Sequence, residues 1–209
     1  MHPVTTVTGT AVVLRRENID TDQIIPAPWM KRIHRDGYGP GLFQNWRKDP
    51  DFPLNDPARA GASILVAGPN FGCGSSRQHA VWALRDGGFR AVISSRIADI
   101  HRTNLPQEGL VPVEVEPDVL DRIMDAVEAD AAAPVRIDVV TRTVTCEPAG
   151  IRDAPFRLDD APHHNLVNGL DPIAVTLTLD DIIRRHETRR HAWLPAGRPE
   201  RSPRQGDHR

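Results

Sequence analysis

The stretch from Ala62 to Leu84 constrains the fold of this chain more than any other, because its pattern changes abruptly from strand to loop to helix. Ala62–Ala67 is a continuous apolar run of the length expected for a buried strand. Glycine and proline interrupt it at Gly68–Gly74, and His79–Leu84 then continues as a helix until two glycines end it. A strand that leads through a glycine-rich loop into a helix is typical of a β-α-β unit.

The same alternation continues along the chain. Apolar runs predict strands, and apolar residues three or four apart predict helices. After the first helix we expect a strand at 89–93, a helix at 97–105, a strand at 110–115 and a helix at 118–129. This order predicts an α/β fold with a mainly parallel β-α-β core and helices on its faces.

Further elements are expected on both sides of that core. The patterns predict a first strand at 10–14, an antiparallel pair at 135–139 and 143–146, a late strand at 173–177 and a closing helix from 180 to about 191. Residues 26–60 are irregular, with many prolines and scattered aromatic side chains. We expect short helical pieces there rather than disorder, because the aromatic rings need a surface on which to pack.

Composition excludes several classes of protein. The 26 Lys and Arg residues nearly balance the 28 Asp and Glu residues, so we expect no nucleic-acid or membrane partner. No apolar stretch approaches the ~18 residues of a membrane span, and the first residues lack a secretory signal, so a cytoplasmic protein is expected. Cys73 and Cys146 are too few for a disulfide framework or for an iron–sulfur cluster, which takes about four thiolates.

One domain is expected over residues 1–193. Residues 194–209 are rich in proline, arginine and other polar residues, and they cannot bury enough apolar surface to offset the entropy of ordering. We expect them to form a disordered, solvated tail. An arginine-rich arm that binds an acidic partner is the alternative.

The glycine-rich loop and the residues after it predict an anion-binding site. Glycines let backbone N–H groups point toward a ligand, and the helix N-terminus adds the positive end of its dipole. Arg77 adds a guanidinium that matches a carboxylate or a phosphate. Gln78 follows Ser75 at the spacing of a capping box, so spacing alone favours a plain N-cap for Ser75 equally well.

Other glycine-rich motifs do not fit this segment. A phosphate-binding P-loop, a dinucleotide fingerprint and a nucleophile elbow each need a spacing that the loop lacks. Nothing else in the sequence supports a thiol nucleophile made of Cys73 and His79. A small buried cysteine in a tight turn and a structural, hydrogen-bonded histidine are the simpler interpretations.

The run Asn70–Leu84, NFGCGSSRQHAVWAL, resembles the signature of the small subunits of isopropylmalate dehydratases and of the matching swivel domain of aconitases. Asn18–Pro26, Gly37–Arg47 and Asn168–Ile173 resemble further motifs of this family in the same order. The resemblance covers about residues 7–190 of the chain. It implies the swivelling β/β/α domain of the aconitase C-terminal type.

The resemblance also implies a reaction. This is a stereospecific dehydration and rehydration that isomerises 2-isopropylmalate and 3-isopropylmalate in leucine biosynthesis. It implies a [4Fe–4S] cluster held by a separate large subunit, in a heterodimer or heterotetramer, and no cofactor bound by this chain. Expelling hydroxide needs a Lewis acid, whereas removing the α-proton needs a base and the dianionic substrate needs a cation. This chain can offer the base and the cation.

The family's residue roles carry over to matching positions. Ser75 is implied as the catalytic base, and Asp22 is implied to orient groups near the active site. Ser76 and Arg77 are implied to bind substrate, and Arg32 is a second substrate-binding candidate whose alternative is a solvated loop arginine. A serine hydroxyl is a poor base at neutral pH, so loop N–H groups and the helix dipole would have to stabilise its alkoxide.

The chain departs from the family at some positions. Gln78 stands where glutamate is usual, and Val81 stands where bacterial isopropylmalate enzymes usually have proline. Residues 98–105 are closer to aconitases, and His163 takes a place where arginine is common. These departures leave the substrate's side group open.

Two alternatives therefore stand beside the first hypothesis. One is the small subunit of a related hydro-lyase for another 2-substituted malate, such as a homoaconitase-like enzyme. The other is a non-catalytic anion-binding module. A pure binder has no need for an alcohol base, so the retention of Ser75 together with Arg77 and Asp22 favours an enzyme.

Overall fold

A computed structural model describes residues 1–191 and 193. Residues Met1–Pro172 form one compact unit that contains two four-stranded sheets. The first is parallel, in the order β2 (Ala11–Leu14), β3 (Ile64–Ala67), β4 (Ala91–Ser94), β5 (Val111–Glu114). The second is antiparallel, in the order β1 (Thr6–Gly9), β6 (Val135–Asp138), β7 (Thr143–Cys146), β8 (Ile151–Pro155). The predicted α/β fold with a parallel core is confirmed, whereas β1 and β8 were not predicted.

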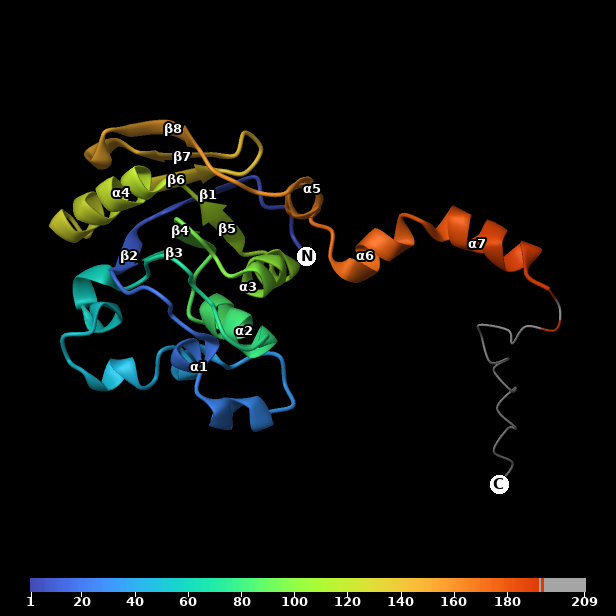
Figure 1. Cartoon of the computed structure of the whole chain (residues 1–209), viewed down its shortest axis with the longest axis horizontal. Coiled ribbons are helices and arrows are strands. Elements are labelled where there is room, and N and C mark those ends of the chain that lie inside the picture. Colours follow the sequence, from blue (N-terminus) through green and yellow to red (C-terminus); the bar gives the residue numbers. More distant parts are fainter. Residues whose placement is uncertain (192, 194–209) are drawn as a thin grey trace, which may run out of the picture. The chain divides into compact units, whose positions relative to one another are not determined.

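Helices cover both faces of the parallel sheet. They are α1 (Thr21–Ile24), α2 (Gln78–Asp86), α3 (Asp99–Asn104), α4 (Pro117–Ala129) and α5 (Asp160–Asn168). Figure 1 shows α4 and the antiparallel sheet on one side of strands β2–β5, and α1 and α2 on the other side. The helices at α2, α3 and α4 were predicted, but α5 was not.

Strands β2–β5 are buried on both faces because successive side chains of a strand point in opposite directions. Val13, Val66 and Ile93 enter one core with α4 and the antiparallel sheet. Their neighbours Leu65 and Val92 enter a second core with α2 and residues of the 26–60 connection. Burial on both faces is the reason that these strands are continuous apolar runs in the sequence.

The 26–60 connection consists of short 3₁₀ turns that pack on aromatic rings, as predicted. The turns are Ala27–Lys31, Gly39–Gly41, Trp46–Lys48, Pro53–Asn55 and Pro57–Arg59. Phe43 is fully buried and stacks on Trp46, with ring centroids 5.3 Å apart. Phe52 meets both rings edge-on. The proline-rich segment is therefore ordered by its own aromatic cluster.

A second unit begins at Ile173. The described helices at and beyond this boundary are α6 (Pro172–Leu177) and α7 (Asp180–Arg189). The strand predicted at 173–177 is wrong, because a short apolar run does not separate strand from helix by periodicity and Pro172 starts a helix well. The helix predicted from residue 180 is confirmed. A single domain over 1–193 stays a prediction, and the predicted tail at 194–209 lies outside the described residues.

No helix within residues 1–191 and 193 has both the length and the apolar composition that crossing a bilayer requires.

Candidate functional site

The glycine-rich loop lies at the carboxyl end of β3, between the loops that follow β2 and β4. On the β2 side, the Asn18 N–H donates to the Pro69 carbonyl oxygen at 2.9 Å. The Gly72 and Cys73 N–H groups both donate to the Ile19 carbonyl oxygen, at 2.7 and 3.2 Å. These backbone bonds fix the loop against the segment that leads into α1. Ligands of parallel sheets commonly bind at this carboxyl edge.

The loop after β4 holds the other side of the glycine-rich loop. The Phe71 N–H donates to the Arg96 carbonyl oxygen at 3.1 Å, and the Ala98 N–H donates to the Phe71 carbonyl oxygen at 2.9 Å. The buried Ser94 hydroxyl donates to the Gly68 carbonyl oxygen at 2.9 Å. The loop is thus fixed from both neighbouring strands by the chain's own hydrogen bonds.

Two glycines of the loop are required by its shape. Gly72 has a φ of +75°, and a Cβ there would lie 2.3 Å from Cγ of the His101 ring. Gly74 has a φ of +86°, and a Cβ there would lie 3.5 Å from Cβ of Asp20. Residues that carry a side chain rarely adopt this left-handed backbone conformation. The tight turn of the loop places Ser75 at the surface, three residues before α2 begins.

Ser75 and Ser76 are both exposed. The Thr21 hydroxyl donates to the Ser75 carbonyl oxygen at 3.0 Å, which anchors the backbone at this residue. Among the described residues, neither the Ser75 hydroxyl nor the Ser76 hydroxyl has a hydrogen-bond partner. Both hydroxyl groups are therefore free to meet a ligand.

The N-cap that the spacing of Ser75 and Gln78 left open as an alternative is not formed. Helix α2 begins at Gln78 with Arg77 as its N-cap, and no side chain caps it. The capping box of this site belongs instead to α1, where Asp20 accepts from the Gln23 N–H at 2.8 Å and the Gln23 side chain accepts from the Asp20 N–H at 2.9 Å. The first N–H groups of α2 thus stay available to an anion.

Arg77 and Asp22 are brought together by the fold, although they are far apart in the sequence. The Arg77 guanidinium donates to the Asp22 carboxylate. The Arg77 side chain is only 14% exposed, whereas Asp22 is 56% exposed. Asp22 therefore restrains a cation beside the open end of α2, and it leaves part of its own carboxylate in solvent.

Arg32 is held in a different place. Its guanidinium lies over the rings of Trp29, at 5.0 Å, and Tyr38, at 5.6 Å, and it donates to the Gly37 carbonyl oxygen at 2.7 Å. These partners all belong to residues 29–38. The structure therefore groups Ser75, Ser76, Arg77 and Asp22, and it places Arg32 in an aromatic cluster that touches the site through His79.

His79 packs its ring edge against Tyr38, at a centroid distance of 5.5 Å, and against Trp82, at 5.0 Å. Burial, with a smaller effect of Arg77, lowers the pKa of His79. The ring has the structural surroundings that we expected. Its contacts are with rings rather than the expected hydrogen bonds.

Two supporting residues were not found from the sequence. His101 on α3 is 2% exposed, its ring meets Phe71 edge-on at 5.4 Å, and its Nε2 has no partner among the described residues. Burial lowers the pKa of His101 to about 4. Glu108 accepts hydrogen bonds from Gln78, at 3.2 Å, and from Trp82, at 2.8 Å. No local motif marks either residue, because each acts through long-range contacts.

The residues of this chain do not fit an iron–sulfur cluster. Cys73 is half-buried in the loop, and burial and the Asp20 charge raise the pKa of its thiol. Cys146 is buried in the core under the antiparallel sheet, where burial raises its pKa. Within the described ranges, no three His, Cys, Asp or Glu side chains come together as metal ligands. The two thiols lie in different parts of the fold and cannot form one ligand set.

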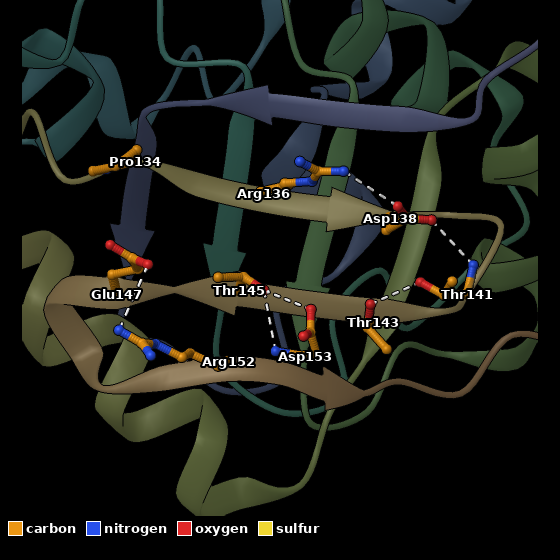
Figure 2. A pocket seen from close by; sticks show the side chains of 9 residues that line it. All are labelled: Pro134, Arg136, Asp138, Thr141, Thr143, Thr145, Glu147, Arg152 and Asp153. Atoms are coloured by element: carbon orange, nitrogen blue, oxygen red, sulfur yellow. Dashed lines mark hydrogen bonds and ion pairs between the residues drawn. The ribbon is translucent and has the colours of Figure 1, made fainter.

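A surface depression of about 860 Å³ lies away from the glycine-rich loop, on the outer face of β6, β7 and β8. Figure 2 shows that its charged side chains already have partners within the depression. Arg136 lies 3.4 Å from Asp138, and Arg152 lies 3.9 Å from Glu147. Such a face is the polar, solvated side of an antiparallel sheet. It holds no counterpart of the serine–arginine arrangement in the loop.

Comparisons with known proteins identify the family. The family model of the aconitase C-terminal domain matches residues 1–118. The 3-isopropylmalate dehydratase small subunit of Parafrankia sp. is 53% identical over 195 residues, which are 93% of this chain and 98% of that protein. The subunit of the same name from Micrococcus luteus is 50% identical and covers 97% of this chain and 99% of its own length.

A solved structure supports the fold. The crystal structure of 3-isopropylmalate dehydratase from Methanocaldococcus jannaschii matches with a TM-score of 0.64 and 23% identity. The match covers 87% of this chain and 99% of that chain. The swivelling β/β/α domain expected from the sequence is thereby confirmed.

Proposed function

This chain belongs to the family of 3-isopropylmalate dehydratase small subunits, and we propose that residues 72–77 form the half of the active site that it contributes. It is a subunit of a hydro-lyase of leucine biosynthesis. The enzyme isomerises 2-isopropylmalate and 3-isopropylmalate by removing water and adding it back at the neighbouring carbon.

Ser75 is the base in this proposal. As an alkoxide, its Oγ takes the proton from the carbon next to a carboxylate and becomes a hydroxyl. The C–H electron pair forms the double bond, and the hydroxyl group leaves the adjacent carbon as hydroxide with the C–O electron pair. The observation that carries the assignment is the exposed Ser75 hydroxyl, which has no partner in the described part of the chain and lies before the uncapped start of α2. N–H groups and the helix dipole at that end favour the negative charge of an alkoxide.

Arg77 and Ser76 bind the substrate. A guanidinium forms two parallel hydrogen bonds with a carboxylate, so Arg77 is suited to one end of the dianionic malate. Asp22 orients Arg77 through their ion pair. Arg32 is a weaker candidate, because its contacts with Trp29 and Tyr38 already occupy its guanidinium.

The remaining part of the site belongs to a partner. We infer that the large subunit holds the [4Fe–4S] cluster, because Cys73 lies in the loop and Cys146 in the core under the antiparallel sheet, so they cannot ligate it together. The assembly is proposed to be a heterodimer or a heterotetramer in the cytoplasm. This chain then supplies the base and the carboxylate clamp.

The experiment is reconstitution of the whole enzyme. The chain is co-expressed with its cognate large subunit, the cluster is rebuilt under anaerobic conditions, and the absorbance of the alkene intermediate is followed with 2-isopropylmalate. We expect turnover from the complex and none from this chain alone. Activity of this chain alone would contradict the two-subunit proposal, and a complex that turns over no 2-substituted malate would contradict the enzyme proposal.

A second candidate keeps the mechanism and changes the substrate. The aconitase-like segment 98–105 includes His101, whose ring lies directly against Gly72 of the loop. Because residues 98–105 are closer to aconitases than to isopropylmalate enzymes, the site under the loop favours a substrate whose side group differs from isopropyl. The same assay with a series of 2-substituted malates, including homocitrate, ranks kcat/KM and decides which malate is preferred.

A further inference from the structure

A charged pocket of about 410 Å³ lies beside the catalytic loop. It is built by the loop after β4 together with α3, by the end of β5 and by the segment after β8. Its charged lining residues are Arg96, Asp99, Arg102, Glu114, Glu116 and Arg157.

The pocket and the catalytic loop share one edge of the parallel sheet. Strands β3, β4 and β5 run in the same direction, so their carboxyl ends lie together. Arg96 touches the loop directly through its carbonyl oxygen, which accepts from the Phe71 N–H at 3.1 Å. The next residue, Ile97, donates its N–H to the Glu114 carboxylate at 2.7 Å. The lining of the pocket is thus directly hydrogen-bonded, through Arg96, to the glycine-rich loop that carries Ser75.

Some charges of the pocket are satisfied within the chain. Arg102 pairs with Asp159 at 2.7 Å and lies 3.7 Å from Asp99. The Glu114 carboxylate accepts the hydrogen bond from Ile97 described above. These groups shape the pocket but leave little charge for a partner.

Other charges of the pocket are not satisfied. Arg96, Arg157 and Glu116 are exposed, and their side chains make no ion pair or hydrogen bond with any residue that the structure describes. Two cations and one anion therefore remain. Elsewhere on the surface, Arg136 and Arg152 of the depression in Figure 2 are paired with the carboxylates of Asp138 and Glu147.

We propose that this pocket docks acidic side chains of the large subunit on Arg96 and Arg157. The inference rests on the proposed function: if the large subunit completes the site at Ser75, the edge that carries Ser75 faces it, and the adjoining pocket enters the same interface. Complementary charges at the rim of an interface speed association and fix orientation. The partner then places carboxylates opposite the two arginines and none opposite Glu116.

The test compares two pairs of charge reversals in the full chain. Arg96→Glu with Arg157→Glu removes the proposed docking cations, and Arg136→Glu with Arg152→Glu is the matched control on the antiparallel sheet. Each variant is first checked for an unchanged thermal transition, and then titrated with purified cognate large subunit at low and high salt. We expect the docking pair to raise the Kd about tenfold and to weaken its salt dependence, while the control pair stays near wild type.

A single variant adds an opposite expectation. Glu116→Gln removes the one free anion of the pocket, so binding of the large subunit becomes equally tight or tighter. A weaker complex would mean that the partner presents a cation here, which contradicts the proposal.

The outcomes separate this inference from the proposed function. An unchanged Kd for the Arg96→Glu, Arg157→Glu pair overturns the docking proposal, and so does an equal loss in the control pair. An unchanged Kd with a raised KM would make the pocket a substrate subsite and would also overturn it. When the large subunit is saturating, the docking variants keep the wild-type kcat; a wild-type complex without turnover would instead refute the proposed function, whatever the Kd values are.

Discussion

Arg77 carries a permanent charge in a place where little solvent reaches it, and Asp22 is the group that balances this charge. An ion pair with one partly exposed member contributes little to stability. In the proposed function the ion pair instead orients the Arg77 guanidinium, which must face the substrate's carboxylate with both N–H groups aligned. Asp22 is therefore a positioning residue in that proposed function.

Asp22→Asn tests that role. Without the charged partner, Arg77 samples other rotamers, so we expect KM for the malate to rise about tenfold with kcat within about twofold. Asp22→Glu retains the charge and is expected to recover most of the affinity. Steady-state kinetics of the assembled enzyme provide the measurement. A fall in kcat at an unchanged KM would assign Asp22 to the chemical step instead.

His101 couples the stability of the loop to pH. Burial lowers its pKa to about 4, whereas a histidine in the unfolded chain titrates near 6.5. Between these values the unfolded state binds more protons, so the free energy of unfolding falls as pH falls. Its contribution is fully present above about pH 6.5 and is lost toward pH 4, a difference on the order of 3 kcal/mol.

His101→Phe keeps a ring under Gly72 and removes the titration. We expect denaturant unfolding of this variant to lose much less stability between pH 7 and pH 5 than the wild-type chain. His34→Phe, at an exposed histidine, is the control and should behave as wild type. An identical pH dependence in His101→Phe and wild type would show that another group causes the acid sensitivity.

Gln78 is suited to the neighbour that this chain provides. Its amide donates to the Glu108 carboxylate at 3.2 Å, so a glutamate at 78 would place two like charges together. We expect Gln78→Glu to destabilise the chain at pH 7 by about 1–3 kcal/mol, with part of the loss offset by the helix dipole. Adding Glu108→Gln removes the like-charge pair but also the ion pair of Glu108 with Arg85, so it should restore only part of the stability. A double-mutant cycle from urea unfolding measures the coupling, and strictly additive effects would contradict it.

At the scale of elements, the turn between β3 and α2 depends on the absence of a side chain at Gly72. Gly72→Ala adds both left-handed backbone strain and a Cβ 2.3 Å from the His101 ring, and we expect a loss of about 2–4 kcal/mol. Gly88 also has a positive φ, of +95°, but a Cβ there meets nothing within 4 Å. Gly88→Ala should therefore cost only about 1 kcal/mol. Equal losses at both positions in chemical denaturation would mean that the close approach to His101 does not matter.

The elements that could be predicted from the sequence are those whose pattern is set locally. Strands β2–β5 are buried on both faces and helix α4 has one apolar stripe, so hydrophobic pattern alone identifies them. Strand β8 was missed because only Ile151 of its five residues is buried, which leaves no alternation to detect. The late strand was wrong because five apolar or β-branched residues in a row suit either state.

The candidate site was predictable as a motif and not as a geometry. Glycines followed by Ser75, Ser76 and Arg77 are enough to predict an anion site from the sequence. The pairing of Arg77 with Asp22, the ring of His101 and the carboxylate of Glu108 depend on contacts between distant segments. Spacing alone could not separate a helix cap at Ser75 from a ligand-binding loop, because both use the same residue types.

At the scale of the whole molecule, the unit Met1–Pro172 contains both cores and every residue of the proposed site. Neither α6 nor α7 contains a buried residue. We expect a chain that ends at Pro172 to unfold in one cooperative transition with a Tm within about 4 °C of the full chain. A loss of cooperative unfolding in that shorter chain would show that residues beyond 172 contribute to the core.

In the proposed function the whole chain supplies half of an active site. It presents a serine and an arginine at one edge of its parallel sheet. Its two thiols lie in different parts of the fold, where they cannot together ligate an iron–sulfur cluster. The central claim is that the Ser75 hydroxyl moves the proton.

The most direct measurement is kcat of the Ser75→Ala enzyme, assembled with its large subunit and compared with Ser76→Ala. We predict that Ser75→Ala assembles with wild-type affinity and lowers kcat by about two to four orders of magnitude, while Ser76→Ala mainly raises KM. A fully assembled Ser75→Ala enzyme with kcat near wild type would contradict the account.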